Sequence, residues 1–242
     1  MVDDTIPRRG FLLSATAIAT GLASTVQGDA QTATVSASAS SPTPIPTVCA
    51  EPEVMLALTA TEAAFVSAAV DAFIPADELS PSGTDCGIVT YIDRQLASAW
   101  GGGAKTYRSG PYQKGKPEQG YQLALTPKEF FSAGIAETNE WSRMTYGKEF
   151  DRLAPADRIS ALKAMEEGKA EFIGLGCKPF FEALLAVTME GFFSDPIYGG
   201  NRDKAAWKML GFPGLPATYA SKFDEYLAKR YTAPPQSIAD FS

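Results

Sequence analysis

The chain contains no histidine among its 242 residues, and this absence excludes several kinds of site. Ser-His-Asp and Cys-His nucleophiles need an imidazole as the general base. Imidazole metal sites are excluded for the same reason. A covalently attached c-type haem needs the motif Cys-x-x-Cys-His, which this sequence cannot provide. Histidine-based catalysis and c-type haem binding are therefore excluded.

Cysteine and positive charge are also scarce. The three cysteines, Cys49, Cys86 and Cys177, lie far apart, so the sequence contains no metal-binding pair. Their odd number allows one internal disulfide and leaves one cysteine over. The net charge of −7 argues against nucleic-acid binding, which needs clustered Lys and Arg, and gives no reason to expect strong attraction to anionic lipid.

Long hydrophobic runs are lacking as well. The apolar stretch at residues 11–26 contains Ser and Thr and is shorter than the ~20 residues that cross a bilayer. It follows an arginine pair and precedes small residues up to Ala30, a layout typical of a twin-arginine export signal. The alternative is an arginine pair that occurs by chance. The predicted export signal consists of Arg8, Arg9, Phe11 and Leu12.

Composition divides the chain into three predicted parts. Residues 1–30 are the predicted signal peptide, and residues 31–53, rich in Ala, Ser, Thr and Pro, are a predicted flexible linker. Residues 54–242 are the predicted helical domain. Because this export route carries folded proteins, a chain without an apparent cofactor that uses it could accompany a folded partner.

Hydrophobic spacing predicts helices and no strands, so the expected fold is all-α: a single compact helical domain with long Gly-, Pro- and aromatic-rich loops. Thr59 with Glu62, and Thr126 with Glu129, have the spacing of capping boxes. Pro127 and Pro155 suit first helical positions. The loop at 104–123 is long enough to be functional. The expected helices cover about residues 59–74, 88–99, 127–146, 155–167, 178–192 and 217–230.

The densest turn-forming sequence lies at residues 192–203 and 207–214, which read FFSDPIYGGNRD and WKMLGFPG. Gly199, Gly200 and Asn201 can take positive φ angles, and proline fixes φ, so a rigid turn region is expected. These two stretches resemble the signature of the gluconate 2-dehydrogenase subunit 3 family. Three further stretches are similar to the family pattern: 73–77, 91–96 and 107–123.

The resemblance implies a role in a three-part, membrane-bound periplasmic dehydrogenase for gluconate, 2-ketogluconate or a similar sugar acid or polyol. FAD would be in the large subunit, and a multihaem cytochrome c subunit would contain haem c. The small subunit would hold no cofactor, metal or catalytic residue. It would support the folding, stability and export of the large subunit through the twin-arginine translocase, as a non-catalytic partner at the inner membrane.

Two alternatives remain open for the residues of this region. Asp195, Arg202 and Asp203 could form an acid–base set in an independent periplasmic enzyme, although turn capping and ion pairing explain them as well. The aromatic residues could pack in the core or contact a partner, since aromatics and Arg dominate binding hot spots. The candidate partner interface consists of Phe193, Asp195, Tyr198, Asn201, Arg202, Trp207 and Phe212.

Cys86 is expected to lie in an accessible loop after the first helix, and Cys49 lies in the linker. In an oxidising compartment these two cysteines are candidates for a disulfide. Cys177 would then be free, buried or bonded to another subunit. A disulfide that involves Cys177 is the alternative.

Overall fold

The computed structural model describes residues 54–104, 106–107, 109–113, 115–116, 119–215, 220, 223–227 and 233–241. All described residues belong to one compact unit, residues 50–242. The predicted export signal and the whole predicted linker, which includes Cys49, therefore lie outside the described residues.

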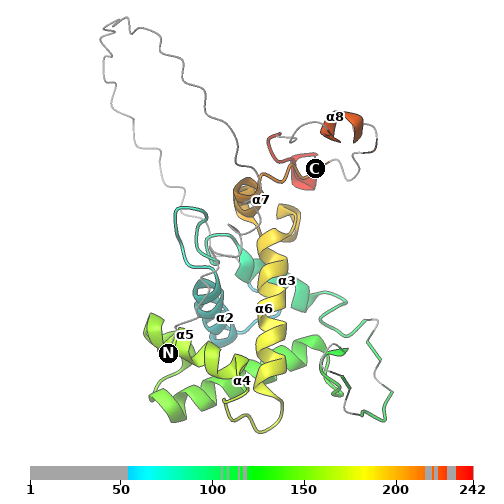
Figure 1. Ribbon diagram of the computed structural model, residues 1–242. Coiled ribbons are helices and arrows are strands. Elements are labelled where there is room, and N and C mark those ends of the chain that lie inside the picture. The colour runs from blue at the N-terminus through cyan, green and yellow to red at the C-terminus, as the bar shows by residue number, and fades with distance from the viewer. Residues whose placement is uncertain are drawn as a thin grey trace, which may run out of the picture. The chain divides into compact units, whose positions relative to one another are not determined.

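The described residues form helices and no strands, which confirms the predicted all-α class. A single isolated bridge joins Gly214 to Gln236. The α-helices are α2 (Ala60–Phe73), α3 (Ile88–Ala97), α4 (Pro127–Tyr146), α5 (Pro155–Glu166), α6 (Cys177–Phe193), α7 (Ala205–Leu210) and α8 (Phe223–Leu227) (Figure 1). The short 3-10 helices are η2 (Phe150–Arg152), η3 (Pro196–Tyr198), η4 (Arg202–Lys204) and η6 (Ile238–Phe241).

The starts of α2 and α4 confirm the two predicted capping boxes. The Thr59 hydroxyl accepts from the Glu62 amide at 3.3 Å, and a Glu62 carboxylate oxygen accepts from the Thr59 amide at 2.8 Å. Thr126 and Glu129 repeat this arrangement at 3.2 and 2.8 Å. Both boxes satisfy amide groups that a helix start leaves without a partner.

One predicted helix end differs from the structure. Helix α3 ends at Ala97, because Ser98 adopts an extended conformation and bonds back to Gln95. Ala99, the last residue of the predicted 88–99 helix, lies beyond this end and is exposed. Of the helix predicted at 217–230, the structure describes Ala220 and α8, where Phe223 and Leu227 are exposed.

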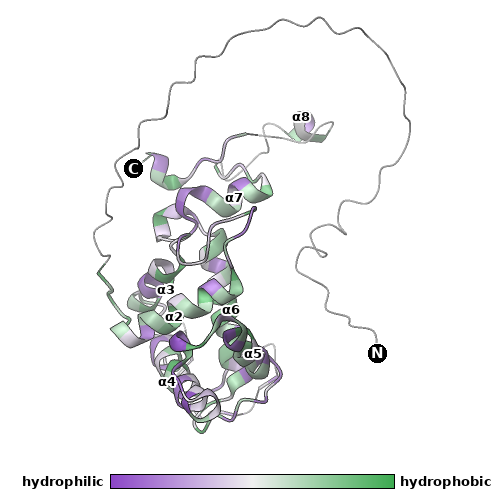
Figure 2. Ribbon diagram, turned by 90° about the vertical axis from the view of Figure 1, so that its left-hand side faces the viewer, coloured by the Kyte–Doolittle hydropathy of each residue, from purple (hydrophilic) through white to green (hydrophobic). Residues whose placement is uncertain are grey.

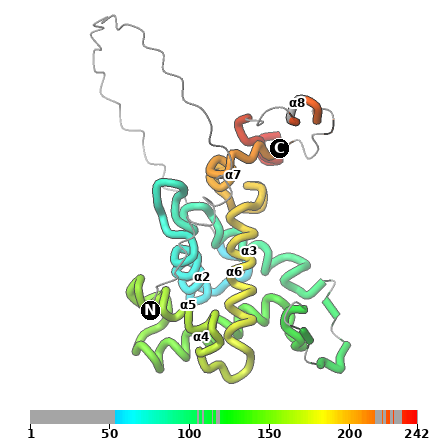
Figure 3. Tube along the Cα trace, in the orientation of Figure 1, coloured from blue at the N-terminus to red at the C-terminus, as the bar shows by residue number. Residues whose placement is uncertain are grey.

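Helix α6 is the central element of the described domain, with contacts to α2, α3, α4, α5 and α7. It appears as the long yellow helix in Figure 1, and the tube in Figure 3 follows the same path. Figure 2 shows hydrophobic residues, in green, along α2 and α6. A helix with this many neighbours needs apolar side chains on most sides, as its sequence has.

The core is built from phenylalanine rings of different helices. Phe65, Phe130, Phe150 and Phe180 are all buried. The rings of Phe65 and Phe150 lie 4.8 Å apart, and those of Phe130 and Phe180 lie 6.1 Å apart. Gly134 of α4 faces this cluster, where a Cβ atom would lie 2.1 Å from the Phe180 ring. Glycine therefore allows α4 and α6 to approach closely.

Asp93 of α3 connects the chain before α2 to the helical core. Its carboxylate accepts hydrogen bonds from the backbone amides of Leu56, Ala57 and Leu58 at 2.7 to 2.9 Å. The residue is buried, so these three donors replace the water that an isolated carboxylate would need. Asp93 thus has a structural role.

Candidate functional site

The segment of residues 193–214, here called the motif segment, begins where α6 ends and packs against the start of α3. The Arg202 amide donates to the Cys86 carbonyl at 2.9 Å. A Cβ atom at Gly87 would lie 2.4 Å from the Gly199 carbonyl oxygen, and one at Gly199 would lie 2.9 Å from Thr90. Small residues on both sides therefore allow the two backbones to touch.

Asn201 is fully buried at the centre of this segment, with 0% of its surface exposed. Its Nδ2 donates to the Ser194 carbonyl at 2.9 Å, and its Oδ1 accepts from the Ala206 amide at 2.9 Å. One side chain thus connects the end of α6 to the start of α7. A buried amide bonded on both sides specifies one arrangement of the backbone around it.

The backbone of this region takes unusual conformations. Asn201, Asp203 and Lys204 have φ angles of 45°, 57° and 56°, which are uncommon for residues other than glycine. Gly199 has a φ of 99°, so the expected positive φ is found at Gly199 and Asn201. Gly200 does not share it, and glycine is needed there because a Cβ atom would lie 2.2 Å from the Gly191 carbonyl oxygen.

Asp195 uses both carboxylate oxygens in hydrogen bonds. Oδ1 accepts from the Ile197 amide at 3.0 Å and from the Ser237 hydroxyl at 2.9 Å. Oδ2 accepts from the Ile238 amide at 2.9 Å. The carboxylate therefore holds η3 and the chain near Ser237 together, and this arrangement matches the structural interpretation of Asp195 rather than an acid–base role.

The described residues 233–241, here called the C-terminal segment, have further contacts with the motif segment. The Gln236 amide donates to the Pro213 carbonyl at 2.9 Å. The amide of Leu215, the residue after the motif segment, donates to the Gln236 carbonyl at the same distance. The Lys204 ammonium group lies 2.6 Å from an Asp240 carboxylate oxygen. Ser237 is buried by these contacts. The sequence carried no local signal for this docking, because its partners lie about 40 residues apart in the chain.

Trp207 joins α7 to the end of α6. Its indole Nε1 donates to the Phe193 carbonyl at 2.9 Å, and its ring meets that of Phe212 edge-on at 5.2 Å. The ring is mostly buried, so Trp207 mainly fixes the position of α7. An indole N–H with a backbone partner is the usual arrangement for a buried tryptophan.

The motif segment also exposes apolar side chains beside these buried anchors. Tyr198 is 51% exposed and Phe212 is 44% exposed. Phe193, Ile197 and Leu210 of the same segment are partly exposed as well. Of the candidate interface residues, Phe193, Tyr198, Arg202 and Phe212 thus reach the surface, Asp195 is half-buried, and Asn201 and Trp207 are buried.

Cys86, expected to be accessible, is instead buried behind the motif segment with 1% of its surface exposed. Burial raises the pKa of its thiol to about 11, and the nearby carboxylate of Asp85 acts in the same direction. Cys177 is also buried, and within the described residues the two thiols are not joined in a disulfide. The predicted pairing of Cys86 with Cys49 lies outside the described residues.

The described part of the chain contains no cluster of three or more Asp, Glu, Cys or His side chains that could hold a metal ion. No helix within it has both the length and the apolar composition needed to span a bilayer.

These features define an all-α protein in which glycines and buried polar anchors hold a turn-rich segment beside the central helix. The particular family follows from comparison. The chain belongs to the gluconate 2-dehydrogenase subunit 3 family, whose model matches residues 60–214. The match covers α2 to α7 and the whole motif segment, and it ends before the C-terminal segment. No curated protein and no solved structure matches the chain.

Proposed function

We propose that the chain is the non-catalytic small subunit of a periplasmic, membrane-bound flavoprotein dehydrogenase that oxidises gluconate, 2-ketogluconate or a similar sugar acid or polyol. Its partners would be an FAD-containing large subunit and a multihaem cytochrome c subunit. It would stabilise the large subunit and accompany it through the twin-arginine translocase. The observation that carries this proposal is the family match over residues 60–214.

The surface of the motif segment supports a partner-binding role. Its backbone is fixed by Asn201, Asp195 and Trp207, and it still exposes Tyr198 and Phe212. Rigid aromatic side chains on a fixed backbone bind with little loss of conformational entropy. We therefore place the contact with the flavoprotein subunit on this surface.

Co-expression tests the subunit role. The isolated chain should be colourless and should not oxidise sugar acids, whereas expression with the flavoprotein subunit should yield a stable, yellow and active complex. Oxidation of a sugar acid by the isolated chain, without a flavoprotein, would contradict the proposal.

The export role is tested by the location of both subunits in a strain that carries Arg8→Lys with Arg9→Lys. Both should stay in the cytoplasm, and normal export of the large subunit would argue against the carrier role.

Tyr198→Ser tests the proposed contact surface. Because Tyr198 is half exposed, its loss should leave folding unchanged. Removal of an aromatic anchor from a binding surface should weaken affinity for the flavoprotein subunit by tenfold or more, about 1.4 kcal/mol or above. Met144→Ser, at an even more exposed apolar position on α4, is the control and should bind normally. Equal affinity of both variants would place the contact elsewhere.

A further inference from the structure

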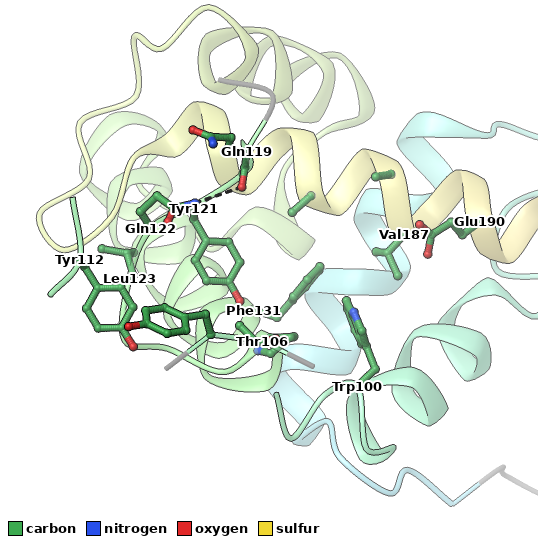
Figure 4. A pocket seen from close by; sticks show the side chains of 15 residues that line it. Trp100, Thr106, Tyr112, Gln119, Tyr121, Gln122, Leu123, Phe131, Val187 and Glu190 are labelled. Atoms are coloured by element: carbon green, nitrogen blue, oxygen red, sulfur yellow. Dashed lines mark hydrogen bonds between the residues drawn. The ribbon is translucent and has the colours of Figure 1, made fainter. Parts of the chain in front are cut away.

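A second candidate site lies between the described part of the 104–123 loop and helices α4 and α6. It is a cavity of about 410 Å³ and shares no lining residue with the motif segment. Figure 4 shows side chains from these three parts of the chain around one open space. Its principal lining residues are Trp100, Tyr112, Tyr121, Phe131, Val187 and Glu190.

Glu190 of α6 is the one ionisable carboxyl group among the described residues that line this cavity. No hydrogen bond or ion pair joins it to the described part of the chain. Its partly desolvated position raises the pKa of the carboxyl group. The described lining contains no Lys or Arg that would balance its charge. Among the described residues, the solvent-accessible Glu190 carboxyl group thus has no positive partner in the cavity wall.

Aromatic rings form much of the remaining wall. The rings of Trp100 and Phe131 meet edge-on with centroids 6.4 Å apart, and Tyr121 stacks on Phe130 at 4.0 Å. The buried hydroxyl of Tyr112 has no hydrogen-bond partner in the described part of the chain. The faces of aromatic rings attract cations through their quadrupoles. The rings and the carboxylate therefore favour the same sign of ligand charge.

Most of the other polar groups in the wall are already used within the loop. The Gln119 side-chain oxygen accepts from the Lys116 amide at 2.7 Å, and the Gln122 side chain donates to the Gln119 carbonyl at 3.1 Å. The Tyr121 hydroxyl donates to the Leu125 carbonyl at 3.3 Å. A polyol would find few free partners there, and a sugar acid would be repelled by Glu190.

We infer that this cavity binds an organic cation, a guanidinium or alkylammonium group, with Glu190 as the counter-charge and the Trp100 and Phe131 rings as an apolar wall. The cation could be a free small molecule or a side chain of another protein, since both present the same chemistry. The inference does not depend on the proposed role in a dehydrogenase, because it uses a different surface.

Titration of the full chain with tetramethylammonium chloride tests the inference. NMR of the Trp100 indole group should show a saturable shift that sodium chloride and sodium gluconate do not produce. Glu190→Gln should weaken binding at least tenfold. Trp100→Leu should weaken it as well, measured by isothermal titration calorimetry because this variant lacks the NMR probe. Glu166→Gln, an exposed carboxyl on α5, is the matched control and should bind like the wild type.

Near-ultraviolet circular dichroism would establish that each variant is folded. Tighter binding of arginine amide than of tetramethylammonium would support the cavity and identify a protein side chain as the source of the cation. The reverse order would support a free ammonium ligand. Absence of a saturable shift in the wild type, or unchanged affinity in a folded Glu190→Gln variant, would overturn the inference.

Discussion

The helical core and the motif segment are held together in different ways. In the core, rings such as Phe65, Phe130 and Phe180 pack against one another and are almost fully buried. In the motif segment, the backbone is fixed by polar side chains, above all Asn201 and Asp195, whose partners are backbone groups. The core therefore depends on how well the side-chain volumes fill the interior, and the motif segment depends on the geometry of its hydrogen bonds.

The core mainly supplies folding stability, whereas the motif segment mainly holds a defined surface. Apolar burial is non-directional and roughly proportional to area, so the core supplies most of the folding free energy and tolerates substitutions of similar volume. Buried hydrogen bonds add little net stability, but loss of one partner is costly because it leaves the other unsatisfied. The motif segment thus holds its backbone with buried polar groups while Tyr198 and Phe212 stay exposed.

The largest expected effect is in the core. Phe180→Ala should lower the free energy of unfolding by about 3–5 kcal/mol, because it removes a ring that meets Phe65, Phe130 and Phe131 at 6.0 to 6.3 Å. Urea unfolding is the measurement. Phe180→Leu should cost clearly less, and Ile159→Ala, at an exposed position, should change stability by no more than about 0.5 kcal/mol. Equal losses for all three variants would contradict a packed ring cluster.

Asn201→Ala should cost about 2–4 kcal/mol, because it leaves the Ser194 carbonyl and the Ala206 amide without partners. It also places alanine at a φ of 45°. Asn201→Gly loses the same hydrogen bonds but tolerates this backbone, so it should be less destabilising than alanine by roughly 1 kcal/mol. Urea unfolding compares the two variants. If glycine is the worse substitution, backbone strain at this position is negligible.

The sequence predicted the helical core well because its signals are local. Thr59 and Thr126, each with an acidic residue three positions later, define helix starts within a few residues of chain, and the structure has both capping boxes. The all-α class and the burial of α2 follow from periodicity in the same way. The error at Ala99 has a local cause too, since the early stop at Ser98 has no strong breaker in the sequence.

The motif segment was located by its composition, but its internal arrangement could not be predicted. Nothing near Asp195 indicates that its carboxylate binds Ser237 and Ile238, more than 40 residues further along the chain. Likewise, no pattern distinguishes the buried Trp207 from the exposed Tyr198. The cavity beside Glu190 arises where a loop meets two helices, and hydrophobic periodicity contains no information about such a meeting.

A smaller effect, confined to one part of the chain, is expected from Asp195→Asn. The substitution replaces the acceptor of the Ile238 amide with a group that donates, which should cost about 1–2 kcal/mol in local opening of the C-terminal segment. Hydrogen exchange at the Ile238 amide should accelerate about tenfold or more, while exchange in α2 and α6 stays unchanged. Asp203→Asn is the matched control, because Asp203 is exposed and its carboxylate has no hydrogen bond in the described part of the chain. Equal exchange in both variants would show that Asp195 does not hold the C-terminal segment.

The smallest expected effect concerns the ion pair between Lys204 and Asp240. The hydrogen bonds that Asp240 accepts from Lys204 and from the Ser237 amide lower the pKa of its carboxyl group. A carboxyl group whose pKa is depressed by folding stabilises the folded form above its unfolded pKa of about 4, and this contribution disappears as the pH falls through the folded pKa. Protection of the Ser237 amide from hydrogen exchange, corrected for the intrinsic rate, should therefore be constant from pH 7 to 5 and decrease below pH 4.

Lys204→Gln should reduce the protection of this amide at pH 7 and make that protection less sensitive to salt, since exposed ion pairs are screened by salt. Wild-type protection that does not change down to pH 2 would show that Asp240 contributes nothing, and that backbone bonds such as the Gly214–Gln236 bridge suffice to hold the C-terminal segment on the motif segment.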